Sequence, residues 1–173
     1  MKKLFSSIAL VALAGMIVAT GAGALDTGTV TATVTADVIA VTVADGGVAY
    51  GTLAPGATAN TVTLTDTQIV TNTGNVAEDF EIKGTDVEDG WDIGPAAGSD
   101  IYFHGWCKDL AGGCDAVGDY AAMTNGYSTG FVSNKTADGH TDLDLWIRVP
   151  TVNTMTDEQA VDVTILATKY IAP

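Results

Sequence analysis

The chain has 173 residues and carries 7 basic against 21 acidic side chains, which gives a formal net charge of −14. A surface this acidic repels phosphate backbones and anionic lipid headgroups, because contact with phosphate requires clustered lysine and arginine. The composition therefore excludes nucleic acid as a partner.

The first 24 residues predict an export signal. Two lysines precede an apolar stretch, and Ala22-Gly23-Ala24 offers the small-x-small pattern after which signal peptidase cuts. A retained membrane anchor is the alternative, but serines, a threonine and glycines interrupt a run that would need about 20 apolar residues to span a bilayer. We expect cleavage before Leu25 and a secreted or cell-surface protein without stable membrane insertion.

The remaining residues, 25–173, predict one all-β domain, a single antiparallel β-sandwich of immunoglobulin-like or jelly-roll type. The dominant pattern has period two, and almost nothing has the 3.6-residue period of a helix. Residues 29–44 alternate valine or alanine with threonine, and the register changes after Asp37. Two short strands, or one strand bent by a bulge, fit this segment.

Short strands joined by tight turns follow along the chain. Turns are predicted at Asp45-Gly46-Gly47 and Ala54-Pro55-Gly56, because proline fixes φ and glycine accepts positive φ. Asn72-Thr73-Gly74-Asn75 predicts a compact hairpin connection. The strands expected from this pattern cover residues 48–53, 60–64, 68–72, 78–83, 100–106 and 129–133.

Two runs near the C-terminus have the clearest half-buried alternation. Residues 143–149 and 161–167 flank a polar stretch, and we expect them to pair as a long hairpin. Trp146 falls on the polar face of the first run. A loop from the middle of the chain is expected to cover it; a binding role is the alternative.

Residues 85–140 predict a loop-rich insertion within the sandwich, dense in glycine, acidic and aromatic residues. Long loops inside a compact domain are often functional. Any ligand contact is therefore expected here, with aromatic rings stacking on a carbohydrate while nearby acids bond to its hydroxyls. The candidates for these rings are Trp91, Trp106, Tyr120 and Tyr127.

Cys107 and Cys114 are the two cysteines of the chain, and in an exported protein they predict one disulfide. The alternative is a tetrahedral zinc site completed by His104 and His140. Neither the gap between the cysteines nor the distance to His140 matches the usual short spacing of zinc ligands.

Acidic residues in the same region leave calcium open, and no other cofactor is expected. Ca²⁺ selects oxygen ligands, but the spacing of these acids does not follow the EF-hand pattern, and an acidic chain shows such turns for solubility alone. The two candidate groups are Asp100, Asp109, Asp115 and Asp119, and Asp86, Glu88, Asp89 and Asp92.

Catalytic signatures are largely missing from the sequence. It has no G-x-S-x-G elbow, H-E-x-x-H helix, phosphate-binding loop or dinucleotide fingerprint. Neither histidine has an identifiable nucleophilic partner. We therefore expect that the protein is not an enzyme.

A resemblance covers about residues 48–83. Residues 51–56 read GTLAPG, residues 69–75 read IVTNTGN and residues 80–82 read FEI. This order resembles secreted immunoglobulin-like and jelly-roll proteins of the TasA and camelysin type, which are exported biofilm-fibre subunits. Camelysin-type proteins have been regarded as metalloproteases, but the zincin motif is missing here.

The resemblance implies a subunit that polymerises by lending an extended N-terminal strand to its neighbour, since an unpaired sheet edge accepts an added strand. The donor segment would lie within residues 27–43, and its apolar residues are Val30, Val34, Ile39 and Val41. The alternative is an ordinary first strand of the domain's own sheet.

Two functions thus remain open from the sequence. The first is a secreted or cell-surface structural protein, a fibre or extracellular-matrix subunit that associates with itself. The second is an extracellular module that binds carbohydrate or another surface partner through the loop aromatics.

Overall fold

The computed structural model describes residues 30–108 and 113–173. The chain divides into two units, residues 1–34 and residues 35–173. The signal peptide expected over residues 1–24 lies outside the described residues. Of the first unit, residues 30–34 are described; they are exposed and belong to no strand or helix.

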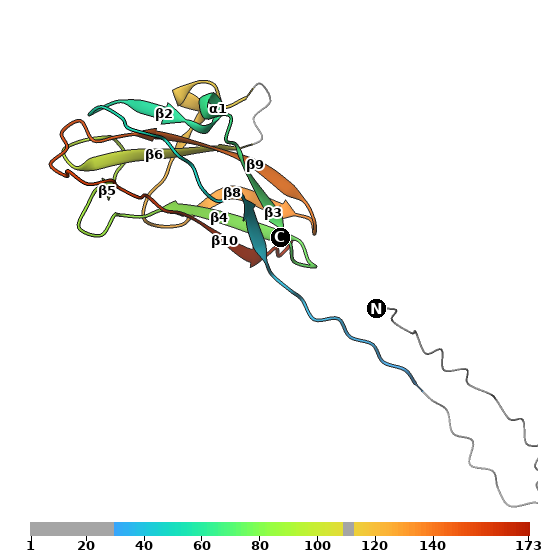
Figure 1. Cartoon of the computed structure of the whole chain (residues 1–173). Helices are drawn as coiled ribbons and strands as arrows, with labels where there is room; N and C mark the ends of the chain where they lie inside the picture. Colours follow the sequence, from blue (N-terminus) through green and yellow to red (C-terminus); the bar gives the residue numbers. More distant parts are fainter. Residues whose placement is uncertain (1–29, 109–112) are drawn as a thin grey trace, which may run out of the picture. The chain divides into compact units, whose positions relative to one another are not determined.

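Residues 35–173 fold into two β-sheets packed face to face (Figure 1). The seven-stranded sheet contains β1 (Val41–Ala44), β2 (Thr58–Asn60), β3 (Gln68–Asn72), β5 (Asp92–Ile93), β6 (Ile101–Lys108), β7 (Ala121–Ala122) and β9 (His140–Arg148). The three-stranded sheet contains β4 (Glu78–Gly84), β8 (Ser128–Lys135) and β10 (Val163–Lys169). The predicted all-β class and antiparallel sandwich are therefore confirmed.

The order of strands is β1-β3-β9-β6-β5 in the larger sheet and β10-β4-β8 in the smaller one. In the larger sheet β2 also pairs with β9, and β7 with β6. All pairings are antiparallel except the short β5 to β6 contact. In the described part of the chain no helix is long and apolar enough to cross a membrane.

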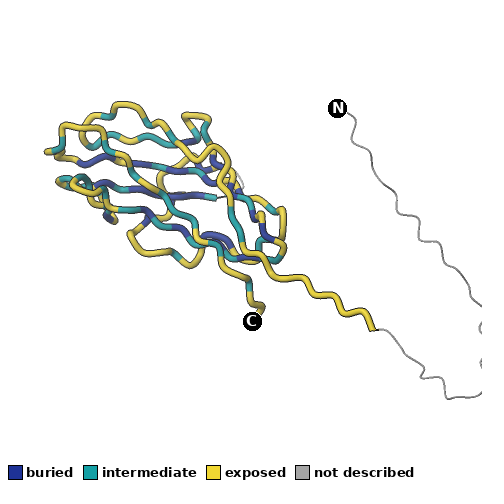
Figure 2. Tube along the Cα trace, turned by 60° about the horizontal axis from the view of Figure 1, so that its bottom comes forward, coloured by how far each residue is buried: buried dark blue, intermediate teal, exposed yellow. Residues whose placement is uncertain are grey.

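The core lies between the sheets and follows from the alternation of the strands. Along β4 every second residue is buried, including Phe80 and Ile82, and along β9 Leu143 and Leu145 are buried (Figure 2). Trp106 of β6 meets Phe131 of β8 edge to face across the sandwich, with ring centroids 5.3 Å apart. Packing of one apolar face against another holds the two sheets together.

The predicted hairpin of the last two runs is wrong. β9 pairs with β2, β3 and β6, whereas β10 pairs with β4 in the other sheet. The alternation was interpreted correctly, since Leu145 of β9 and Ile165 of β10 both contribute to the core. The polar stretch between them crosses from one sheet to the other, so the apolar faces meet across the core.

The hairpin predicted at Asn72-Thr73-Gly74-Asn75 is wrong for a similar reason. β3 and β4 belong to different sheets, and these residues form the corner between them. Asn72 is fully buried, and its Nδ2 donates to the carbonyl oxygens of Val76 at 2.8 Å and Lys135 at 2.9 Å. The asparagine thus fastens the corner to β8.

The strand predicted over residues 60–64 is wrong: β2 ends at Asn60 and one helical turn, α1 (Thr61–Leu64), follows. The Asn60 side chain accepts from the Thr63 N–H at 2.7 Å and caps this turn. The Thr61 hydroxyl donates to Asp144 at 2.8 Å. Local side-chain bonds of this kind compete with a strand ladder.

The strand predicted over residues 48–53 does not form either, and the alternating segment 29–44 yields only β1 among its described residues. β1 pairs with β3, with Val41 opposite Asn72. The predicted strands over 68–72, 78–83, 100–106 and 129–133 are confirmed, and no end differs by more than two residues.

Both predicted turns are present. Asp45 and Gly46 have φ values of 70° and 69°, and Gly56 has φ 74° directly after Pro55. The Ala57 N–H donates to the Ala54 carbonyl at 2.9 Å and closes the second turn. Positive φ at Gly56 with proline before it is the geometry of a type II turn.

Candidate functional site

A cleft of about 860 Å³ lies between the two sheets. Leu143, Leu145 and Ile147 of β9 line it from the seven-stranded sheet. Val163 and Ile165 of β10 line it from the three-stranded sheet. The strand alternation that builds the core thus also supplies the apolar lining of the cleft.

Two segments that form no strand wall the cleft, residues 46–53 and residues 156–162. The first is tied to the larger sheet by the Gly46 N–H, which donates to Gln68 Oε1 at 2.9 Å. Near the second segment, the Trp91 indole N–H donates to Asn153 Oδ1 at 3.0 Å. The walls are therefore anchored at a few points rather than along a hydrogen-bonded ladder.

His104 of β6 is the buried polar group among the several polar side chains that line the cleft, which include the acidic Asp157, Glu158 and Asp162. Its side chain is 1% exposed, and Nε2 lies 3.0 Å from the Tyr50 hydroxyl. Nδ1 is buried and has no hydrogen-bond partner among the described residues. Burial lowers the pKa of His104 to about 4, because the surroundings solvate the imidazolium poorly.

The pKa of Tyr50 is shifted in the opposite direction from that of His104. Burial, and then the neighbouring Tyr120 and Asp66, raise the pKa of Tyr50 well above its ordinary value. The Tyr50 and His104 pair is therefore uncharged at neutral pH. Such a pair holds the 46–53 segment against β6 and presents no ionised group to the cleft.

β10 has an unpaired edge beside the cleft. Its one strand partner within the described residues is β4, and Val163, Thr164 and Ile165 are all half-buried. An edge of this kind presents unpaired main-chain N–H and C=O groups to an incoming strand. The cleft thus combines an apolar lining with a hydrogen-bonding edge.

The predicted disulfide is confirmed, since Cys107 and Cys114 are bonded to each other. The zinc alternative is wrong, because neither sulfur is free to bind a metal. The Tyr120 hydroxyl donates to the Cys114 carbonyl at 2.7 Å and fastens the disulfide loop.

Trp146 is covered as expected. It packs against the cluster of Cys107, Cys114 and Tyr120 on the outer face of the seven-stranded sheet. Its ring also meets Phe103 edge to face, with centroids 5.1 Å apart. The middle of the chain therefore forms a small second core over β6 and β9.

The structure does not bring the four candidate aromatics together. Trp106 lies in the core and Tyr120 in the disulfide cluster, and both are buried. Trp91 lines the cleft. Tyr127 is 38% exposed, with Lys83 Nζ 4.8 Å from its ring centroid.

A different aromatic pair lines a smaller hollow of about 220 Å³. Phe103 and Trp146 lie there beside Pro95, Val117 and Arg148. Phe103 of β6 and Trp146 of β9 both lie at alternating positions that point away from the core. The alternation in the sequence of those strands could have indicated that the two rings share one face of the sheet. Phe103 and Arg148 are directly opposed in the β6 to β9 register.

Three of the acidic candidates accept hydrogen bonds from main-chain N–H groups. Asp86 accepts from the Ile93 N–H at 2.9 Å, Asp100 from the Thr154 N–H at 2.7 Å and Asp119 from the Ala116 N–H at 2.8 Å. Asp109 lies outside the described residues. Within residues 30–108 and 113–173 no group of three or more potential ligands gathers to hold a metal. Calcium binding stays a prediction.

The structure separates the four donor candidates. Val30 and Val34 are 92% and 95% exposed and belong to the first unit of the chain. Ile39 is 46% exposed, and Val41 is the first residue of β1. We call residues 25–34 the arm and residues 36–40 the root.

No family model matches this chain, and comparison with curated proteins and with solved structures finds no significant relative for it.

Proposed function

We propose that the protein is a secreted or cell-surface structural protein, a fibre or matrix subunit whose copies join by β-strand addition. The arm of one copy would occupy the cleft of the next and extend the three-stranded sheet at the free edge of β10. Catalysis has no part in this proposal.

The observation that carries the proposal is the cleft beside the unpaired edge of β10, whose inner lining is apolar and whose 156–162 wall is polar. The lining side chains come from the inward faces of both sheets, among them Leu145 and Ile165. The walling segments 46–53 and 156–162 leave main-chain groups outside any ladder. An added strand would satisfy main-chain groups at the edge and fill the cleft with alternate side chains.

The arm has the chemistry of such a strand. Val30, Ala32 and Val34 lie in one phase and Thr31 and Thr33 in the other, with no charged side chain between them. At about 3.3 Å per residue the ten arm residues would span roughly 33 Å when extended. Burying each valine would contribute about 1.5 to 3 kcal/mol.

Assembly of the secreted, processed protein tests the proposal. Electron microscopy and light scattering should show fibres for the intact arm and monomers after deletion of residues 25–34. The deleted protein should keep its circular dichroism and melting temperature, because the described arm residues are exposed and lie outside the folded unit.

Point variants of the arm give a matched control. Val30→Asp should abolish fibres, because it would bury a charge in the cleft. Thr31→Asp adds the same charge one residue later, in the solvent phase, and should leave assembly largely intact. Fibres formed without the arm, or lost equally in both variants, would refute strand addition.

The arm can also be supplied separately. A synthetic peptide of residues 25–36 should bind the arm-deleted domain and raise its melting temperature, since a ligand that binds only the folded state stabilises it. The same peptide with aspartate at Val30 should not bind.

Carbohydrate binding is the second candidate, favoured by the hollow of Phe103 and Trp146. Aromatic rings beside a guanidinium offer a stacking surface and hydrogen-bond donors, and Arg148 donates through Nε to the Gly56 carbonyl at 3.2 Å. Trp146 fluorescence during titration with oligosaccharides tests it. A saturable change that Phe103→Ala removes would support it, and no change with neutral or acidic glycans would rule against it.

A further inference from the structure

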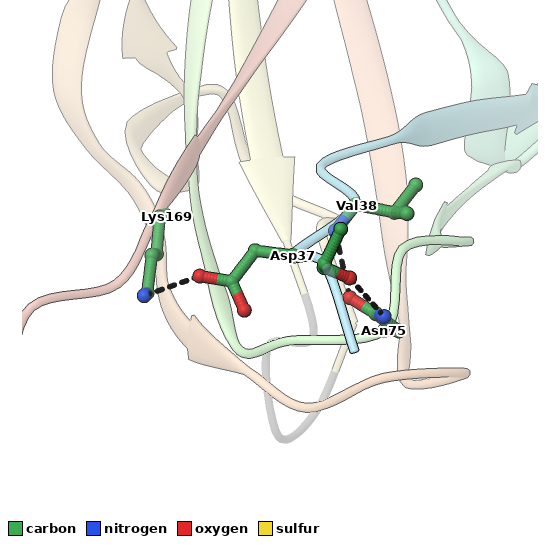
Figure 3. Close-up of polar contacts among 5 residues, drawn as sticks. Asp37, Val38, Asn75 and Lys169 are labelled. Atoms are coloured by element: carbon green, nitrogen blue, oxygen red, sulfur yellow. Dashed lines mark hydrogen bonds and ion pairs between the residues drawn. The ribbon is translucent and has the colours of Figure 1, made fainter. Parts of the chain in front are cut away.

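The root of the arm, residues 36–40, is bound to the domain through its main chain. The Val38 N–H donates to Asn75 Oδ1 at 2.7 Å, and Asn75 Nδ2 donates to the Ala36 carbonyl at 2.9 Å (Figure 3). The Asn75 N–H in turn donates to the Val38 carbonyl at 3.0 Å. One asparagine thus holds three main-chain groups of the root, one at Ala36 and two at Val38.

The next residues of the root are held in the same way. The Thr73 N–H donates to the Ala40 carbonyl at 2.9 Å. The Ala40 N–H donates to Glu78 Oε1 at 2.9 Å. Glu78 is fully buried and its Oε2 has no hydrogen-bond partner among the described residues, so a buried carboxyl group, which is costly to desolvate, is placed where it receives the root.

An ion pair ties the root to the C-terminal strand. Lys169 Nζ of β10 lies 2.6 Å from Asp37 Oδ2, and both side chains are half exposed (Figure 3). A pair this exposed contributes little to stability. It does connect the root to the three-stranded sheet, while β1 continues into the seven-stranded sheet.

Gly74 allows the root to approach this closely. A Cβ at that position would fall on Glu78 Oε1 and on the Val38 carbonyl oxygen. Because one of these obstacles is main chain, a larger residue would have to displace the root itself. The corner between β3 and β4 is therefore shaped to receive residues 36–40.

We propose that the root and its partners form a mechanical clamp, which passes tension from the arm to both sheets. This inference rests on the proposed function in one respect, that the arm is the link between copies. Tension along the root acts in line with β1, whose hydrogen bonds to β3 run across the strand direction. Bonds loaded in this way share the force and resist together, whereas bonds opened from one end break in turn.

Single-molecule force measurement on the monomer tests the clamp independently of assembly. One handle is attached before Leu25 and the other at Glu158, through a clickable amino acid. Glu158 is exposed at the wall of the cleft, where a neighbour's arm would sit. The pull then crosses the domain as it would within a fibre.

Asn75→Ala removes both side-chain bonds to the root and should lower the rupture force by roughly a third. Gly74→Ala should lower it at least as much. Gly130→Ala is the matched control, because a Cβ there meets no atom of the described residues within 4 Å, and the force should not change. Lys169→Met keeps the aliphatic stem, and the force should fall slightly.

Hydrogen exchange identifies the bonds that have been lost. The Val38 and Ala40 amides should exchange slowly in the parent and markedly faster in Asn75→Ala and Gly74→Ala, while the core strand β4 keeps its protection. Equal rupture forces in the parent and Asn75→Ala, both folded, would overturn the clamp. Failure of the parent to form fibres would instead count against the proposed function, since these measurements use the monomer.

Discussion

Apolar side chains are buried to different degrees on the two sides of the sandwich, which we call the closed side and the cleft side. On the closed side, β4 and β8 face β6 and β9, and Phe80, Ile82 and Phe131 are at most 1% exposed. On the cleft side, the facing layer is formed by residues without a ladder, and Val48, Tyr50 and Ile165 are only partly buried. The same alternating pattern serves both sides.

This difference shows that alternation predicts which residues face inward but not whether the inner layer is complete. Full burial requires paired strands on both sides of the core, because a ladder satisfies main-chain groups along its whole length. Where one layer consists of segments anchored at single points, apolar side chains keep part of their exposure. The cleft is the place where the sheets lack such a strand.

The largest difference in stability between the two sides should come from truncating a core side chain. Phe80→Ala on the closed side should cost about 3 to 5 kcal/mol of unfolding free energy, from lost burial and the cavity left behind. Val48→Ala in the cleft wall should cost less than about 1.5 kcal/mol, since that side chain is only partly buried. Urea unfolding of both variants measures the contrast, and equal losses would contradict it.

Lowering the pH should destabilise the protein through protonation of His104 on the cleft side. Its folded pKa of about 4 lies below the ordinary value of 6.5, so the unfolded chain binds the proton first. The contribution of neutral His104 to the free energy of unfolding is therefore fully present above about pH 6.5 and is lost as the pH falls towards 4. The full loss amounts to about 3 kcal/mol. His104→Gln should lose less stability than the parent between pH 6.5 and 4 in paired urea titrations. Parallel pH profiles would contradict this role of His104.

The disulfide stabilises a region that belongs to neither side, the second core over β6 and β9. Replacing Cys107 and Cys114 together by alanine should cost about 2 to 3 kcal/mol, on the view that the bond restricts the unfolded chain. Binding of the arm peptide should be unaffected, because neither cysteine lines the cleft. A loss of peptide binding in a folded variant would show that the two regions are coupled.

The smallest effect is expected at Tyr50. Tyr50→Phe removes the hydroxyl beside His104 Nε2 and should cost about 1 kcal/mol, because a buried polar atom loses its partner. Tyr127→Phe, at a more exposed position, should change stability by less than about 0.5 kcal/mol. Thermal unfolding of the two variants provides the comparison.

The fold class could be predicted from the sequence because the alternation is strong and the turn residues are specific. Strands around Phe80 and Leu145 are predicted on that basis, and the disulfide follows from two cysteines in a chain that is expected to be exported. Pairing was harder to predict, as β9 and β10 show. A polar connection between two strands can cross from one sheet to the other or turn back within the same sheet. The alternation of apolar and polar residues is the same in both cases and does not distinguish them.

The candidate site was predicted less well, for physical reasons. The cleft arises because the predicted strand over residues 48–53 forms no ladder, which depends on tertiary partners that alternation does not reveal. From the sequence, His104 is considered only as a candidate zinc ligand and as a histidine without a nucleophilic partner. Its contact with Tyr50 joins residues 54 positions apart in the chain, and no local pattern announces it.

The position of the last residues has a practical consequence. The Tyr170 N–H donates to the Ala77 carbonyl at 2.9 Å, and Lys169 reaches Asp37, so these last residues lie beside the root, at its junction with the arm. A fluorophore or affinity tag fused after Pro173 would therefore sit next to that junction. Such a label would report on movement of the junction but would also crowd it, whereas a probe in the turn at Gly126 would avoid this interference.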